Sequence, residues 1–246
     1  MADRKALRLS AILLAGGFIF FWVVSLFHPS GVDANSHPAV FAQYAQSTTW
    51  TTVHLGGFVG FAVVIAGLLV LLYALRLQGG MAELGVRVGS VSAGVALGLT
   101  AVQAAVDGVT LKRAVDALAI APDAEKAARY ASAEAVRWLE EAITSYQGFV
   151  LGFTLILLAA LIVWTGRAPR PVGYILGLSG AAYLVRGWIL GVAGFALQGA
   201  SPTYLGNGCL LIAGIWLLIS AWRMPESAET PPEDASPAMR DEAGLH

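Results

Sequence analysis

The sequence predicts an all-α, polytopic membrane protein: a bundle of six transmembrane helices with its N- and C-termini in the cytoplasm. Two observations predict this fold class. The 246-residue chain is 57% hydrophobic but only 13% charged, and its apolar residues come in unbroken runs. Soluble domains usually carry about 25% charged residues, and an apolar run of about 18 or more residues is long enough to cross a bilayer as a helix.

Each of the six apolar runs predicts one transmembrane span. The first run is expected to remain as a helix rather than to be removed as a signal peptide, because no small-x-small cleavage site follows it. The single Cys209 excludes a disulfide framework and a cysteine-based metal cluster within one chain. The expected spans are Leu9–Phe27, Val53–Leu75, Val88–Leu111, Ile143–Thr165, Val172–Leu197 and Leu205–Trp222.

Basic residues next to the runs predict the orientation in the bilayer. Four groups of them lie on one side, while the connections after the first and fifth runs, on the other side, contain no Lys or Arg. The connection after the third run, also on that other side, carries five Lys or Arg residues together with several acids. Cytoplasmic loops carry the excess of positive charge, so the side with the four groups is expected to face the cytoplasm of a cell (inner) membrane. Tryptophans near the run ends are expected to anchor at the membrane interface; these are Trp22, Trp50, Trp138, Trp164 and Trp222.

Two segments differ in composition from the spans. Residues 112–141 are rich in Ala, Glu, Lys and Arg, which favour helices, and contain one break at Pro122-Asp123. They are expected to form an extracytoplasmic helical extension of the six-helix transmembrane domain, which covers residues 1–223. Residues 224–246 are acidic and rich in proline, which predicts a disordered cytoplasmic tail.

Polar residues recur at helical spacing within the spans. Thr100, Gln103, Asp107 and Thr110 follow i, i+3, i+7 and i+10, so an α-helix would place them on one face. An ionisable group at mid-bilayer costs at least about 2.5–3.5 kcal/mol, so such faces must turn to the bundle interior or to a wet cavity. Similar stripes are Ser47, Thr51 and His54; Glu140, Thr144 and Gln147; and Ser179, Tyr183 and Arg186.

These stripes predict a polar cavity that opens to the extracytoplasmic side. The residues expected to bind a ligand or to exchange protons there are His54, Asp107, Gln103, Arg186, Tyr183, Glu140 and Gln147. Asp107 needs a partner, and the sequence leaves open an ion pair with Arg186 or with Lys112 or Arg113. Glu140 is also what the helix macrodipole favours at the start of a helix, which is a structural alternative.

The favoured function is a non-enzymatic membrane protein that binds a small polar or ionic ligand for transport or sensing, with no catalytic residue assigned. One alternative is a metal-dependent, hydrolase-like membrane enzyme, in which His28, His54 and Asp107 would hold zinc or iron. No H-E-x-x-H or comparable ligand spacing supports that alternative. A second alternative is a structural or assembly subunit.

The expected partners are the lipid bilayer and the small ligand, and homo-oligomerisation stays open. A net charge of −1 argues against a nucleic-acid partner. The sequence contains no Walker motif and no G-x-S-x-G, so neither ATP hydrolysis nor an α/β-hydrolase nucleophile has support.

Overall fold

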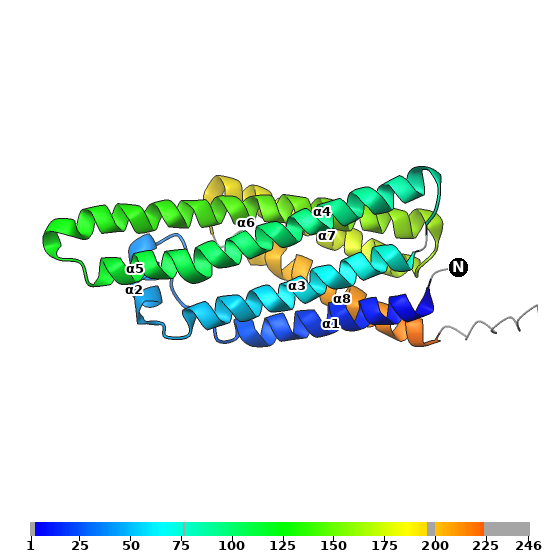
Figure 1. Cartoon of the computed structure of the whole chain (residues 1–246), viewed down its shortest axis with the longest axis horizontal. Coiled ribbons are helices and arrows are strands. Elements are labelled where there is room, and N and C mark those ends of the chain that lie inside the picture. The colour runs from blue at the N-terminus through cyan, green and yellow to red at the C-terminus, as the bar shows by residue number, and fades with distance from the viewer. Residues whose placement is uncertain (1–2, 76, 196–199, 224–246) are drawn as a thin grey trace, which may run out of the picture.

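The computed structural model describes residues 3–75, 77–195 and 200–223, and every element of regular structure in these ranges is a helix. The all-α fold class is therefore confirmed. The elements, which can be followed in Figure 1, are α1 (Arg4–Ser25), α2 (His37–Gln46), α3 (Trp50–Ala74), α4 (Gly80–Ala105), the π-helix η1 (Val106–Leu111), α5 (Lys112–Ala119), α6 (Asp123–Thr165), α7 (Arg170–Ala193) and α8 (Ala200–Arg223).

Six helical stretches are long and apolar enough to cross a membrane, as the apolar runs predict. They are α1, α3, the continuous stretch from α4 through α5, α6, α7 and α8. This number fits a multi-pass membrane protein. The helices extend past the runs where capping allows it: α1 begins at Arg4, because the Asp3 carboxylate accepts the backbone N–H of Ala6 at 3.0 Å.

The helix that forms the fifth span ends earlier than the sequence predicts. The fifth span was expected to reach Leu197, but α7 ends at Ala193, where Gly194 takes a positive φ of 65° that stops the helix. Leu197 itself lies outside the described residues, and so does the predicted acidic tail 224–246.

α5 and the first part of α6 form a helical hairpin that extends beyond the other long helices (Figure 1). α6 has 43 residues, or about 65 Å at 1.5 Å per residue, roughly twice the hydrocarbon thickness of a bilayer. The short helix α2 packs beside this hairpin. A hydrophobic cluster joins them, separate from the main core and formed by Val40, Phe41, Tyr44, Trp50, Leu111, Val115 and Ala133.

The main core runs along the bundle, and its closest helix pairs are α1 with α3 and α6 with α7. α6 and α7 approach backbone to backbone at Gly152 and Gly180. A Cβ atom added to Gly180 would lie 2.7 Å from the carbonyl oxygen of Gly152, and one added to Gly152 would lie 2.8 Å from that of Gly180. Small residues thus set the distance between these helices, as is common in membrane bundles.

We expect Gly180→Ala to lower the free energy of unfolding by about 1–3 kcal/mol, because the new methyl group meets backbone atoms that cannot move aside locally. Thermal unfolding of the purified protein in detergent measures this loss. Gly94→Ala on α4 is the matched control, since a Cβ there meets no atom within 4 Å. Equal stability of the two variants would show that the Gly152–Gly180 approach does not limit the packing.

Candidate functional site

A cavity of about 290 Å³ lies between the long helices. This volume is close to the lower end of small-molecule sites in proteins. All six candidate spans contribute to its wall, whose residues are Phe21, Ser25, His28, Val53, His54, Gly57, Phe58, Phe61, Thr100, Gln103, Ala104, Asp107, Gln147, Tyr183, Arg186, Thr203 and Asn207.

The structure brings most of the residues singled out from the sequence to this one cavity. His54, Gln103, Asp107, Gln147, Tyr183 and Arg186 all line it, as does His28. Glu140 does not line the cavity but lies next to Asp107, behind the cavity wall. The polar faces of α3, α4, α6 and α7 therefore adjoin in space, and the role of their residues stays a prediction.

The cavity wall is amphipathic. Val53, Phe58 and Phe61 of α3 and Phe21 of α1 supply apolar surface. A polar network lines another part of the wall: the Tyr183 hydroxyl donates to Asn207 Oδ1 at 2.5 Å, and the Gln147 amide donates to Thr100 Oγ1 at 3.4 Å. A molecule in the cavity would thus meet both aromatic rings and hydrogen-bonding groups.

Arg186 is the arginine of the cavity wall, and its contacts are with uncharged side chains. Its Nη1 donates to Gln147 Oε1 at 3.4 Å, and its guanidinium lies 6.0 Å from the centre of the Tyr183 ring. Within the described part of the chain, no carboxylate pairs with Arg186. The ion pair with Asp107 that the sequence left open is not formed.

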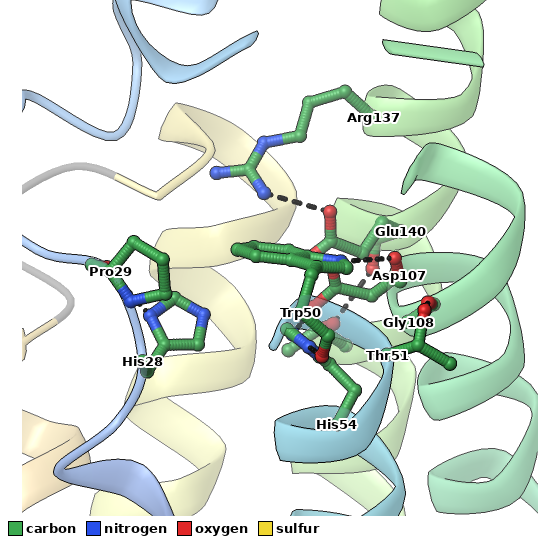
Figure 2. Close-up of polar contacts among 10 residues, drawn as sticks. His28, Pro29, Trp50, Thr51, His54, Asp107, Gly108, Arg137 and Glu140 are labelled. Atoms are coloured by element: carbon green, nitrogen blue, oxygen red, sulfur yellow. Dashed lines mark hydrogen bonds and ion pairs between the residues drawn. The ribbon is translucent and has the colours of Figure 1, made fainter. Parts of the chain in front are cut away.

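Asp107 pairs instead with His54. The Nε2 atom of His54 lies 2.8 Å from Asp107 Oδ2, and its Nδ1 lies 2.8 Å from the carbonyl oxygen of Trp50 (Figure 2). A carbonyl can only accept, so Nδ1 carries a hydrogen and donates it. The alternative cation Lys112 is engaged elsewhere, since its Nζ donates to Asp116 Oδ1 at 2.5 Å and to the Ala45 carbonyl at 3.4 Å.

Glu140 and Arg137 continue this chain of polar groups away from the cavity. Arg137 Nη1 donates to Glu140 Oε2 at 2.8 Å, and the two residues are only 3% and 2% exposed. The Glu140 carboxyl group in turn lies next to the Asp107 carboxyl group (Figure 2). His54, Asp107, Glu140 and Arg137 therefore follow one another in space, and we call these four residues the His–Asp–Glu–Arg chain (Figure 2).

The π-helix η1 places Asp107. Where the α-helical ladder widens into a π turn, backbone carbonyls lose their usual partners, and such turns are frequent at functional sites. Side chains of α3 take their place: the Trp50 indole donates to the Asp107 carbonyl at 2.9 Å, and the Thr51 hydroxyl donates to the Gly108 carbonyl at 2.8 Å. Three residues of α3 thus contact η1, namely Trp50, Thr51 and His54.

η1 overturns two sequence predictions. The polar stripe of the third span was expected to include Thr110, but Thr110 is exposed, because the wider turn rotates the residues after Asp107 off the α-helical repeat. Trp50 was expected to be an interfacial anchor, but it is 1% exposed, and its indole N–H donates to the Asp107 carbonyl of η1. Ser47, predicted to share the face of Thr51 and His54, lies before the start of α3.

Gly108 allows η1 and α3 to come this close. A Cβ atom added to Gly108 would lie 2.6 Å from the Cβ atom of His54, a distance that real side chains do not adopt. Glycine at this position is therefore required by the contact that joins His54 to Asp107.

Aromatic rings surround the cavity side of the His–Asp–Glu–Arg chain. His54 packs against Trp50 with ring centres 4.2 Å apart, and Trp50 packs against Tyr44 at 3.8 Å. The His28 ring packs against Trp50 and His54, with ring centres 5.0 Å and 5.2 Å away. Burial lowers the pKa of His28, and the neighbouring His54 lowers it further, so His28 favours the neutral form.

The residues proposed as metal ligands do not fit a zinc or iron site. Both ring nitrogens of His54 are engaged, one with Trp50 and one with Asp107, so neither lone pair is left for a metal. The Nδ1 atom of His28 lies 2.7 Å from the Pro29 carbonyl. In residues 3–75, 77–195 and 200–223, no three His, Cys, Asp or Glu side chains are grouped as metal ligands.

No family model, curated protein or solved structure matches this chain.

Proposed function

We propose that this protein is a multi-pass membrane protein that binds a small organic anion in the central cavity, for transport or for sensing. The observation that carries the proposal is the environment of Arg186, which lines the cavity and has only neutral contacts among the described residues. A cation inside a bundle is costly unless it is paired. An anionic ligand supplies the missing charge, and a carboxylate matches the planar guanidinium.

The rest of the wall supports an amphipathic ligand. Gln147 and Asn207 can bond polar atoms near Arg186, while Phe21, Phe58 and Phe61 favour a compact apolar body. A carboxylate attached to a small ring or a short chain, such as benzoate, combines these properties at a size that suits a cavity of about 290 Å³.

The orientation with both termini in the cytoplasm is part of this proposal. The guanidinium groups of Arg4 and Arg8 reach the Ala221 carbonyl near the end of α8, and Arg8 lies 4.9 Å from the centre of the Trp222 ring. This end of the bundle is opposite the α5–α6 hairpin (Figure 1). With the end that carries Arg4 and Arg8 in the cytoplasm, the hairpin and α2 would lie outside an inner membrane.

We expect benzoate to raise the melting temperature of the purified protein in detergent, and neutral benzamide to leave it unchanged. Arg186→Gln should weaken benzoate binding about 10- to 100-fold, because a charge-assisted hydrogen bond contributes about 1.5–3 kcal/mol. Titration calorimetry of both variants measures this ratio.

Arg87→Gln is the matched control, since Arg87 is exposed and pairs with Glu83 on the surface of α4. It should bind benzoate as the unmodified protein does. Acetate, octanoate and inorganic phosphate extend the probe set to other anions. If no anion in this set binds, or if Arg186→Gln binds as tightly as Arg87→Gln, the proposed function is wrong.

A further inference from the structure

We infer that Asp107 and Glu140 hold one exchangeable proton between their carboxyl groups, taken up from the cavity, and that His54 positions Asp107 for it. This proton site concerns other residues than the anion site at Arg186 and is tested without any anion. It is built from hydrogen-bond donors and acceptors, which can be counted along the His–Asp–Glu–Arg chain.

The first contact of the chain already contains a hydrogen. His54 donates its Nδ1 hydrogen to the Trp50 carbonyl, so its Nε2 atom can meet Asp107 Oδ2 at 2.8 Å only if a second hydrogen lies between them. We place this hydrogen on His54, because a carboxylate beside an imidazole favours the imidazolium, which then donates to Asp107 Oδ2. This hydrogen bond fixes the Asp107 carboxyl group and leaves its other oxygen, Oδ1, pointing elsewhere.

The second contact lacks a hydrogen. Asp107 Oδ1 is buried, and no N–H or O–H group of the described residues donates to it. Asp107 is 8% exposed and Glu140 is 2% exposed, and the two carboxyl groups lie side by side (Figure 2). Two carboxylates in this position can only accept and repel each other, whereas one added proton turns the contact into an O–H···O hydrogen bond.

The charges around the Asp107–Glu140 pair allow it to bind and release this proton. Arg137 faces Glu140 from α6, and His54 faces Asp107 from α3, so two cations balance two carboxylates before the proton binds. Binding it leaves a net charge of +1 and completes the hydrogen bonding.

The two other titratable groups nearby do not compete for the proton. Burial raises the pKa of Tyr44 on α2 above its ordinary value, so its phenol stays neutral beside Arg137. Burial likewise favours neutral His28 in the loop after α1. The change of charge is therefore confined to Asp107 and Glu140.

The cavity is the source of the proton. Asp107 and His54 line it, while Glu140 lies behind Asp107. In the binding step a hydronium ion or a buffer acid in the cavity loses one proton, and an O–H bond forms on Asp107. Glu140 accepts the hydrogen bond of this new group, and no other bond changes.

Infrared spectroscopy of the purified protein tests this inference directly. At pH 7 and without an anion, we expect the C=O stretch of a protonated carboxyl group, with the shift in D₂O that marks an exchangeable proton. Glu140→Gln and Asp107→Asn should each remove this band. Glu134→Gln, which changes a more exposed carboxylate on the same helix that pairs with His37, should keep it.

Absence of the band from the unmodified protein would overturn the inference, and so would its persistence in both Glu140→Gln and Asp107→Asn. The unmodified spectrum decides even where one variant does not fold. A protein that shows the band but binds no anion would retain the proton site and lose the proposed function. A protein that binds an anion but lacks the band would retain the proposed function and lose the proton site.

Discussion

Replacing Arg137 with methionine should lower the free energy of unfolding by about 3–5 kcal/mol, the largest loss we expect from a single substitution in this protein. Arg137 is 3% exposed and donates to Glu140, and its guanidinium also reaches the Ala34 carbonyl at 3.3 Å and lies 4.2 Å from the centre of the Phe195 ring. Methionine retains much of the apolar contact but leaves the Glu140 carboxylate buried without its cation. Thermal and denaturant unfolding in detergent measure the loss.

The double variant Arg137→Met/Glu140→Gln separates charge from packing. It removes the stranded carboxylate together with its partner, so it should be more stable than Arg137→Met alone, with a coupling energy of about 1–3 kcal/mol in the mutant cycle. Arg129→Met, which breaks an exposed pair with Glu125, should change stability by less than about 1 kcal/mol. If Arg137→Met lowers the free energy of unfolding no more than Arg129→Met does, the buried Arg137–Glu140 pair does not stabilise the fold.

Gly108→Ala is expected to have the second-largest effect, because it acts on fold and site together. The new methyl group would lie 2.6 Å from the Cβ atom of His54, so η1 and α3 must separate. The separation stretches the His54–Asp107 contact and the hydrogen bonds from Trp50 and Thr51 to η1. We expect a loss of about 1–3 kcal/mol in stability and the loss of the protonated-carboxyl band.

Gly98→Ala on α4 is the control for this substitution, since a Cβ atom there meets nothing within 4 Å. It should keep both the stability and the infrared band of the unmodified protein. A Gly108→Ala protein with an unchanged band would mean that the close approach of η1 to α3 does not position Asp107.

The spans were predictable from the sequence because each helix carries a long apolar run, and such a run has one stable form in lipid. The meeting of His54, Gln147 and Arg186 at one cavity follows the same logic, since each lies on a polar helix face that the bilayer would reject. The positions of the helix ends could not be predicted from the apolar pattern. α6 continues for 43 residues because polar helix formers carry it past the apolar run.

The details of the site depended on contacts between distant segments. The π turn at Val106–Leu111 has no local sequence signal, because its carbonyls are satisfied by Trp50 and Thr51. Arg137 was missed as a site residue although it stands three residues before Glu140. In the sequence it belongs to the predicted outer extension. It is buried by groups from distant segments, namely the Ala34 carbonyl and the rings of Tyr44 and Phe195.

The length of α6 has a mechanical consequence. Glu140 and Gln147 stand on one uninterrupted helix whose far end forms the hairpin with α5. A stiff rod of this kind transmits displacement along its whole length, so pulling or turning its tip would shift Glu140 against Asp107 and Gln147 against Arg186 in the same movement. Movement of the α5–α6 hairpin is thereby coupled to the geometry of the Asp107–Glu140 pair and of the anion site at Arg186.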